Sequence, residues 1–160
     1  TFRRATISVP ELMATAEKYF RKVYKGNKAH IDFRIQPLEG RITGDWNQLR
    51  FLLENLIDEA CCITLDGTVC LTAQEEGEFI RFLFTDMRRE KTREELNQLF
   101  YPDLSRMAAG EKGELYGTEY LVCKQIIRDH DEFAGRRGCR INAEPGRKGG
   151  FTIYFTLPKK

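Results

Sequence analysis

Several features that define common protein classes are scarce or absent in this sequence. No apolar run approaches the ~20 residues needed to span a bilayer, and the N-terminal stretch TFRRATISVPEL has no apolar signal-peptide core. The five cysteines form no CxxC pair and only two histidines are present, which argues against a disulfide framework or a zinc site. The 26 Lys and Arg nearly balance 24 Asp and Glu, so the net charge of +2 gives no field that attracts nucleic acid or acidic lipid.

The apolar content is sufficient for a compact fold. With 160 residues, 41% of them hydrophobic, the chain suits a single domain over residues 1–160. It begins at Thr1 without an initiator Met, so we expect the C-terminal part of a longer protein, and a tether through an upstream membrane segment stays open. Unpaired cysteines are typical of a reducing compartment, which favours a cytoplasmic location.

Apolar spacing and capping residues predict the main helices. Ser8 is placed to cap a helix over residues 9–24, and Asp45 is placed to cap a second helix over residues 46–62. A third helix is expected over residues 117–130, with its apolar side chains on one face. These amphipathic helices need a sheet to cover.

Alternating or short apolar runs between turns supply that sheet. They predict strands at residues 30–36, 40–43, 67–74, 78–85, 139–144 and 151–157. We expect the second of these to pair with the first as a short hairpin. A short helix is predicted over residues 93–100, followed by a long loop over residues 101–116. The sum is an α+β fold, a two-layer sandwich with helices on one face of a mixed, mostly antiparallel sheet.

Four segments of the chain, in this order, resemble the ATP-binding domain of sensor histidine kinases, the GHKL or Bergerat-fold family. They are GDWNQLRFLLENLIDEACCIT, similar to the N box; FLFTDMRREKTREELNQLFYP, similar to the first glycine box; GTEYLVCKQIIRDH, similar to the second; and GGFTIYFTLP, similar to the closing strand. The similarity extends from about Ser8 to Pro158. It implies the Bergerat fold and, where the boxes are intact, a site for Mg-ATP.

The N-box segment departs from the family pattern where magnesium and phosphate bind. Asn55 belongs to an Asn-Leu pair that matches the family. Glu59 stands at the position of the magnesium-binding asparagine and offers oxygen ligands if Mg²⁺ is bound, although a solvated carboxylate is the favoured interpretation. Cys62 stands where the resemblance places a basic, phosphate-contacting residue, so a cation is missing.

The first glycine box retains its aspartate but not its glycines. The resemblance implies that Asp86 stands where an aspartate accepts a hydrogen bond from the adenine amino group, and a simple turn cap is the alternative. Arg88 and Glu90 replace the two glycines. Glycine lets the backbone approach the base, whereas these long side chains would need the same space. We therefore expect them to block the pocket.

The second glycine box and the closing strand keep isolated matches. Gly117 matches one glycine, with a loop hinge as the alternative, while Glu119 puts an anion where phosphate would sit. Thr152 matches the strand threonine of the base pocket, with an ordinary strand residue as the alternative. The basic side chains of residues 88–91 form either a solvated turn or ion pairs with Glu59 or Glu119 inside the vacated pocket. Complementary charge favours the ion pairs.

These departures favour a degenerate domain, a pseudokinase, that keeps the fold and acts as a non-catalytic signalling or scaffold module in a bacterial two-component-type regulatory protein. We expect no catalytic residue, no metal and no cofactor. His30 lies on a predicted strand and His130 at a helix end, so neither is placed as a phosphoacceptor.

The expected partner is another protein: the upstream domains, a response regulator or a different signalling protein. Neither nucleic acid nor direct membrane contact is expected. Two alternatives stay open. One is a divergent but working kinase domain in which Glu59 holds Mg²⁺ and Asp86 holds the adenine of Mg-ATP; the other is an anti-sigma-like binding protein.

Overall fold

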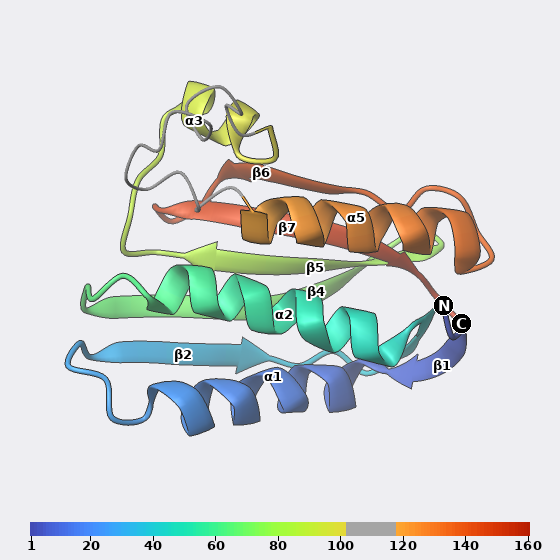
Figure 1. Cartoon of the computed structure of the whole chain (residues 1–160), viewed down its shortest axis with the longest axis horizontal. Coiled ribbons are helices and arrows are strands. Elements are labelled where there is room, and N and C mark those ends of the chain that lie inside the picture. Colours follow the sequence, from blue (N-terminus) through green and yellow to red (C-terminus); the bar gives the residue numbers. More distant parts are fainter. Residues whose placement is uncertain (102–117) are drawn as a thin grey trace.

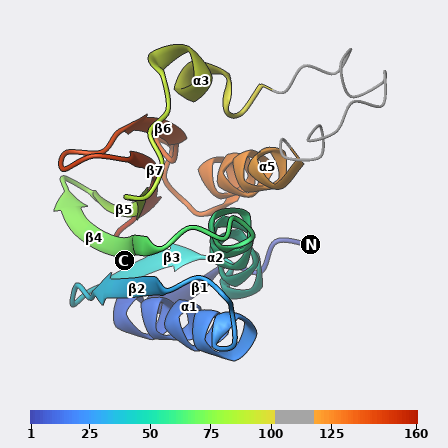
Figure 2. The same cartoon turned by 90° about the vertical axis from the view of Figure 1, so that its left-hand side faces the viewer.

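A computed structural model describes residues 1–101 and 118–160, with the backbone alone for residues 118 and 119. Its main elements form two layers, a sheet and a group of helices that cover one face of it (Figures 1 and 2). The helices are α1 (Val9–Tyr24), α2 (Trp46–Cys61), α5 (Thr118–Phe133) and, apart from the others and near β6, the short α3 (Arg93–Gln98).

The main sheet has five strands in the order β2-β4-β5-β7-β6. β2 runs parallel to β4, and all other neighbours are antiparallel. A mixed, mostly antiparallel sheet with helices on one face confirms the predicted α+β two-layer sandwich. The strands are β2 (Ile31–Gln36), β4 (Gly67–Glu76), β5 (Phe79–Asp86), β6 (Ile141–Pro145) and β7 (Phe151–Pro158).

A separate pair of strands corrects the predicted hairpin. β3 (Arg41–Gly44) pairs antiparallel with β1 (Ala5–Ser8), a strand that the sequence pattern did not indicate, and not with β2. Gly40, at φ +151°, redirects the chain, and its carbonyl accepts a hydrogen bond from the Val9 N–H (3.0 Å). The hairpin prediction was wrong because alternation defines the two faces of a strand and not its partner.

Side-chain caps explain where the helices begin. Ser8 Oγ accepts from the Glu11 N–H (3.3 Å) at the start of α1, and Asp45 Oδ1 accepts from the Gln48 N–H (3.1 Å) at the start of α2. The predicted starts of both helices are confirmed. α5 continues to Phe133 and does not end at His130 as predicted.

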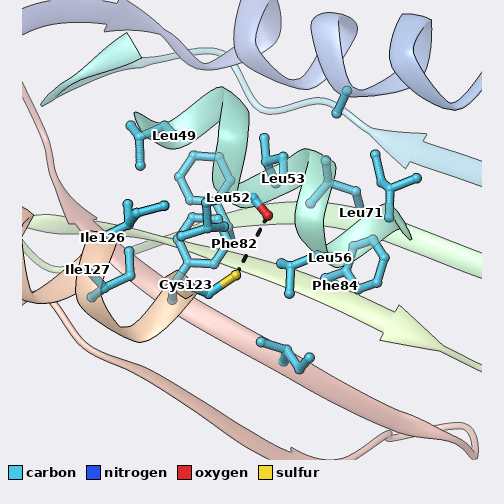
Figure 3. Close-up of a cluster of buried hydrophobic side chains, with 14 of the residues drawn as sticks. Leu49, Leu52, Leu53, Leu56, Leu71, Phe82, Phe84, Cys123, Ile126 and Ile127 are labelled. Carbon is cyan, nitrogen blue, oxygen red and sulfur yellow. Dashed lines mark hydrogen bonds between the residues drawn. The ribbon is translucent and has the colours of Figure 1, made fainter. Parts of the chain in front are cut away.

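The core between the two layers is built by α2, α5 and the central strands (Figure 3). Leucines along one side of α2 pack toward Phe82 of β5, which stacks on Phe155 of β7 with 5.0 Å between the ring centroids. The Cys123 thiol of α5 donates to the Leu52 carbonyl (Sγ–O 3.8 Å). This packing fixes α2 over β5, and both elements end on the same side of the molecule (Figure 1).

Candidate functional site

Asp86 is the last residue of β5 and is the centre of the candidate site. Its side chain is only 1% exposed, on the face of the sheet that the helices cover. A charged group at that depth is stable only if it is paired and hydrogen-bonded. The partners of this carboxylate therefore decide what the site can bind.

Two arginines surround the Asp86 carboxylate. Oδ1 accepts from the Arg88 backbone N–H (3.0 Å) and from Arg88 Nε (2.9 Å). Oδ2 accepts from Arg88 Nη2 (3.0 Å) and from Arg89 Nε (3.0 Å). A carboxylate offers about four lone-pair sites, so these four bonds fill them.

The Arg88 guanidinium has further partners at the C-terminus of α2. Nη1 donates to the carbonyls of Ile63 (3.0 Å) and Leu65 (2.9 Å), and Nη2 donates to the carbonyl of Ala60. The side chain is 1% exposed. The last carbonyls of a helix carry partial negative charge, so a cation at this end is favourable. Arg88 thus joins the end of α2 to the end of β5.

The surrounding charges and hydrogen bonds set the protonation state of Asp86. Burial alone would raise the pKa of this carboxyl, yet the hydrogen bonds and charges of Arg88 and Arg89 hold the pKa below its ordinary value. Asp86 is therefore ionised at neutral pH. It acts as a saturated acceptor and not as a general acid or base.

The segment after Asp86 also contacts β7. Glu90 Oε1 accepts from the Gly150 N–H (2.8 Å), and the Arg89 and Lys91 cations lie 5.5 Å and 5.2 Å from the centroid of the Phe151 ring. Gly150, at φ +72°, is required here because a Cβ would lie 2.0 Å from the Asp86 carbonyl oxygen. These contacts hold residues 88–91 over the end of the sheet.

The three N-box residues lie on or just after α2, and the structure places them differently. The Asn55 side-chain amide donates to the Phe51 carbonyl of its own helix (2.8 Å). Glu59 is half-buried on α2. Cys62 is exposed, and its thiol donates to the Glu59 carbonyl (Sγ–O 3.2 Å). Position 62 therefore carries a thiol and no positive charge.

The structure does not bring Thr152 to Asp86. In the β5–β7 register Asp86 faces Phe151, whereas Thr152 faces Thr85, with 2.8 Å between the two hydroxyl oxygens. Because neighbouring residues of a strand point to opposite faces, Thr152 lies on the other side of the sheet from Asp86. Phe151, which sequence analysis did not single out, is the β7 residue beside the site, and only the strand register reveals it.

Other predicted residues fall partly or wholly outside what the structure describes. Gly117 and the side chain of Glu119 lie outside the described residues, as does the predicted loop after Tyr101. Arg88 directs its donors to Asp86 and to three carbonyls, so among the described side chains its carboxylate partner is Asp86. The predicted ion pairs of residues 88–91 with Glu59 or Glu119 stay a prediction. Sequence analysis also missed the backbone carbonyls that bind Arg88, at the end of α2 and just after it, because a residue of any type carries a carbonyl.

A second buried polar cluster holds the opposite end of α2. His130 of α5 is fully buried, and its Nε2 accepts from the Asp45 N–H (3.0 Å) while its Nδ1 lies 2.8 Å from the Ile126 carbonyl oxygen. A carbonyl only accepts, so Nδ1 carries the proton and the ring is neutral. Burial lowers the pKa of His130 below its ordinary 6.5. Asp45 Oδ2 also accepts from the Arg3 N–H (2.7 Å).

Residues 1–101 and 118–160 contain neither a metal-binding cluster nor a membrane-spanning helix. No group of three or more His, Cys, Asp or Glu side chains in these ranges is placed to hold a metal ion. None of the helices described there has both the length and the apolar character to cross a membrane.

Comparison with known proteins identifies the family. A family model described as "Histidine kinase-, DNA gyrase B-, and HSP90-like ATPase" matches residues 44–160, and the chain belongs to this family. A comparison with curated proteins found no match.

Solved structures that are similar to this chain include histidine kinase domains. The catalytic domain of histidine kinase ThkA in a nucleotide-free form has a TM-score of 0.74 at 21% identity over 98% of both chains. The mycobacterial sensor histidine kinase MprB has a TM-score of 0.70 at 15% identity over 99% of both chains. ThkA in complex with the response regulator TrrA has a TM-score of 0.72 at 19% identity, over 99% of this chain and 42% of that one. By family and fold, the chain is a histidine-kinase-like ATPase domain.

Proposed function

We propose that this domain does not bind Mg-ATP and serves as a non-catalytic signalling module in a bacterial two-component-type regulatory protein. The observation that carries the proposal is the filled carboxylate of Asp86, which accepts from Arg88 and Arg89 at both oxygens. The family resemblance assigns this aspartate to the adenine amino group. An adenine would have to displace a buried guanidinium, which would leave the arginine without its charge partner.

The phosphate side of the site supports the same proposal. Cys62 supplies no positive charge where the resemblance expects a phosphate-binding cation. The Arg88 cation does not replace it, because its donors are bonded to Asp86 and to the end of α2. Within the part of the chain that the structure describes, these residues disfavour a nucleoside triphosphate, which supports a domain without phosphate transfer.

The partner we propose is a protein. The response regulator bound by ThkA indicates a partner class for a domain of this fold. We propose that residues 1–160 form a single domain, that it is the C-terminal part of a longer protein, and that it works in the cytoplasm. Nucleotide-independent binding to a response-regulator receiver domain, measured by calorimetry, tests the partner class.

The ligand part of the proposal is tested by calorimetric titration with Mg-ATP and Mg-ADP. We expect no saturable heat up to millimolar nucleotide. The control variant is Arg88→Gly with Glu90→Gly, which restores the Asp-x-Gly-x-Gly spacing and separates a blocked pocket from an inactive preparation. Micromolar binding of Mg-ATP by the unaltered protein would contradict the proposal.

A divergent working kinase domain is the second candidate, favoured by the ionised Asp86 and by the Glu59 carboxylate on α2. In that case Asp86 would hold adenine and Glu59 would hold Mg²⁺. Binding of Mg-ATP that is lost in Asp86→Asn would establish it. An anti-sigma-like binding protein differs in its partner, and binding to a sigma factor in place of a receiver domain would identify it.

A further inference from the structure

The acceptors around Arg88 bind its guanidinium group on more sides than an ion pair with Asp86 alone would need. A guanidinium has five N–H donors in one plane. In this structure Nε and Nη2 donate to the two oxygens of Asp86, the second Nη2 donor goes to Ala60, and Nη1 donates to Ile63 and Leu65. The acceptors come from two separate parts of the chain and together accept from all three guanidinium nitrogens.

We propose that the C-terminus of α2, the segment over residues 63–67 and the end of β5 form a guanidinium-binding site. Arg88 is its internal ligand, and a free N-alkylguanidinium takes the same place when the Arg88 side chain is removed. This inference rests on the proposed function, because it assigns to the former nucleotide position a different class of ligand, a planar cation.

The charges around the site select a cation. Asp86 is ionised and buried, and the carbonyls of Ala60 and Ile63 lie at the negative end of the α2 dipole. The side chains of Arg88 and Asp86 are each 1% exposed, so these two groups have little contact with water. Low water content strengthens hydrogen bonds to a charged ligand and raises the cost of leaving the acceptors unpaired.

The shape of the site selects a planar group on a narrow stem. Gly67, at φ +137°, lies beside the aliphatic part of Arg88, and a Cβ at that position would be 2.6 Å from Arg88 Cγ. The absence of a side chain at Gly67 therefore makes room for the stem. A compact ammonium has three donors in a tetrahedral arrangement and cannot satisfy acceptors that lie around a planar fork.

The test uses Arg88→Ala with N-ethylguanidinium, which replaces the atoms that the substitution removes. We expect the variant to lose roughly 10 °C in melting temperature, because it leaves a buried carboxylate unpaired. Millimolar N-ethylguanidinium should recover at least half of that loss and leave the unaltered protein unchanged. Propylammonium, a monocation without the fork, and N-ethylurea, a neutral planar analogue, should recover little.

The inference would be overturned if N-ethylguanidinium raised the melting temperature of the variant and of the unaltered protein equally. It would also be overturned if propylammonium restored the melting temperature of the variant as well as N-ethylguanidinium does. Asp86→Asn combined with Arg88→Ala should abolish the rescue, because the charged acceptor is gone. Mg-ATP is titrated into the unaltered protein in parallel: binding there contradicts the proposed function alone, whereas failed rescue contradicts the guanidinium site alone.

A measurement on the unaltered protein covers the case in which Arg88→Ala does not fold. Nitrogen-15 spectra should show one arginine whose guanidinium rotation is slow and whose N–H protons are protected from exchange, because its donors are bonded and buried. Arg88→Lys should remove that signal. If every arginine shows fast rotation, the site is not formed.

Discussion

The two ends of helix α2 are both held by buried polar groups, but their chemistry is opposite. At the N-terminus Asp45 supplies the negative charge and neutral His130 accepts a backbone hydrogen bond. At the C-terminus the Arg88 cation donates to the Ala60 carbonyl in the last turn of α2 and to the Ile63 carbonyl just after the helix. Each arrangement complements the helix dipole at its own end. The C-terminal end of α2 is thus capped by a side chain from elsewhere in the chain, as the N-terminal end is.

The largest expected effect tests whether protein stability depends on the ion pairs of Asp86 near the C-terminal end of α2. Asp86→Ala should lower the free energy of unfolding by about 3–5 kcal/mol, because it leaves Arg88 buried without its charge partner. Urea denaturation measures the loss. Asp32→Ala is the matched control, since Asp32 forms an exposed pair with Arg34 (2.6 Å) and should change stability by about 0–1 kcal/mol. A similar loss in the free energy of unfolding for Asp86→Ala and Asp32→Ala would show that the buried ion pairs at the C-terminal end of α2 stabilise the protein no more than an exposed pair.

The next effect tests the close approach of β7 to Asp86. Gly150→Ala adds a Cβ 2.0 Å from the Asp86 carbonyl oxygen at a backbone φ of +72°, so the strand ends must separate. We expect a loss of about 1–3 kcal/mol in the free energy of unfolding. Gly26→Ala is the control, because nothing lies within 4 Å of the added atom. A Gly150 variant as stable as the Gly26 variant would mean that this contact is loose.

The third prediction concerns pH and acts on the N-terminal end alone. The folded state lowers the pKa of His130 from its ordinary 6.5, so the unfolded chain binds a proton more readily. Stability from this residue is therefore complete above pH 6.5 and is lost as the pH falls toward the lower, folded-state pKa, with a slope of at most about 1.4 kcal/mol per pH unit. Denaturation at several pH values measures the slope.

His130→Gln should flatten that pH dependence. If the slope between pH 6.5 and pH 5 is the same in the variant and the unaltered protein, groups other than His130 control stability there.

The smallest expected effect compares two helix caps. Asp45→Ala should cost about 1–2 kcal/mol, because Asp45 accepts from the Gln48 N–H and from the Arg3 N–H. Ser8→Ala should cost about 0.5–1 kcal/mol, because its single bond at the start of α1 is exposed and long, at 3.3 Å. Thermal unfolding ranks the two. A larger loss of stability for Ser8→Ala would show that the buried polar cluster of Asp45 and His130 contributes little to holding α2.

The parts of the fold that depend on local sequence were predictable. Asp45 and Ser8 are caps that act on residues three positions away, and the helix starts followed from them. The pairing of β3 with β1 was not predictable, because it depends on residues brought together from distant positions. Periodicity therefore predicted the layer class and the elements other than β1, while strand partners required the structure.

The candidate site also combines features that the local sequence predicts with features that depend on distant residues. Asp86 and Arg88 were identified from the glycine-box spacing, but the Arg88 partners at Ile63 and Leu65 are backbone carbonyls that leave no mark on the sequence. Sequence analysis expected Thr152 of β7 near Asp86, but the strand register places Phe151 opposite Asp86. The difference is one residue, and one residue moves a side chain to the other face of a sheet.

The position of the chain ends has a practical consequence for measuring ligands. Lys159 forms a bridge with Ile42 and the Lys160 N–H donates to the Arg41 carbonyl, so the last residues attach to β3, which also pairs with β1. Both ends thus lie together, on the side of the molecule opposite the C-terminal end of α2 (Figure 1). A surface tether or a fluorescent label placed at either end would leave the neighbourhood of Arg88 accessible to partners and small molecules.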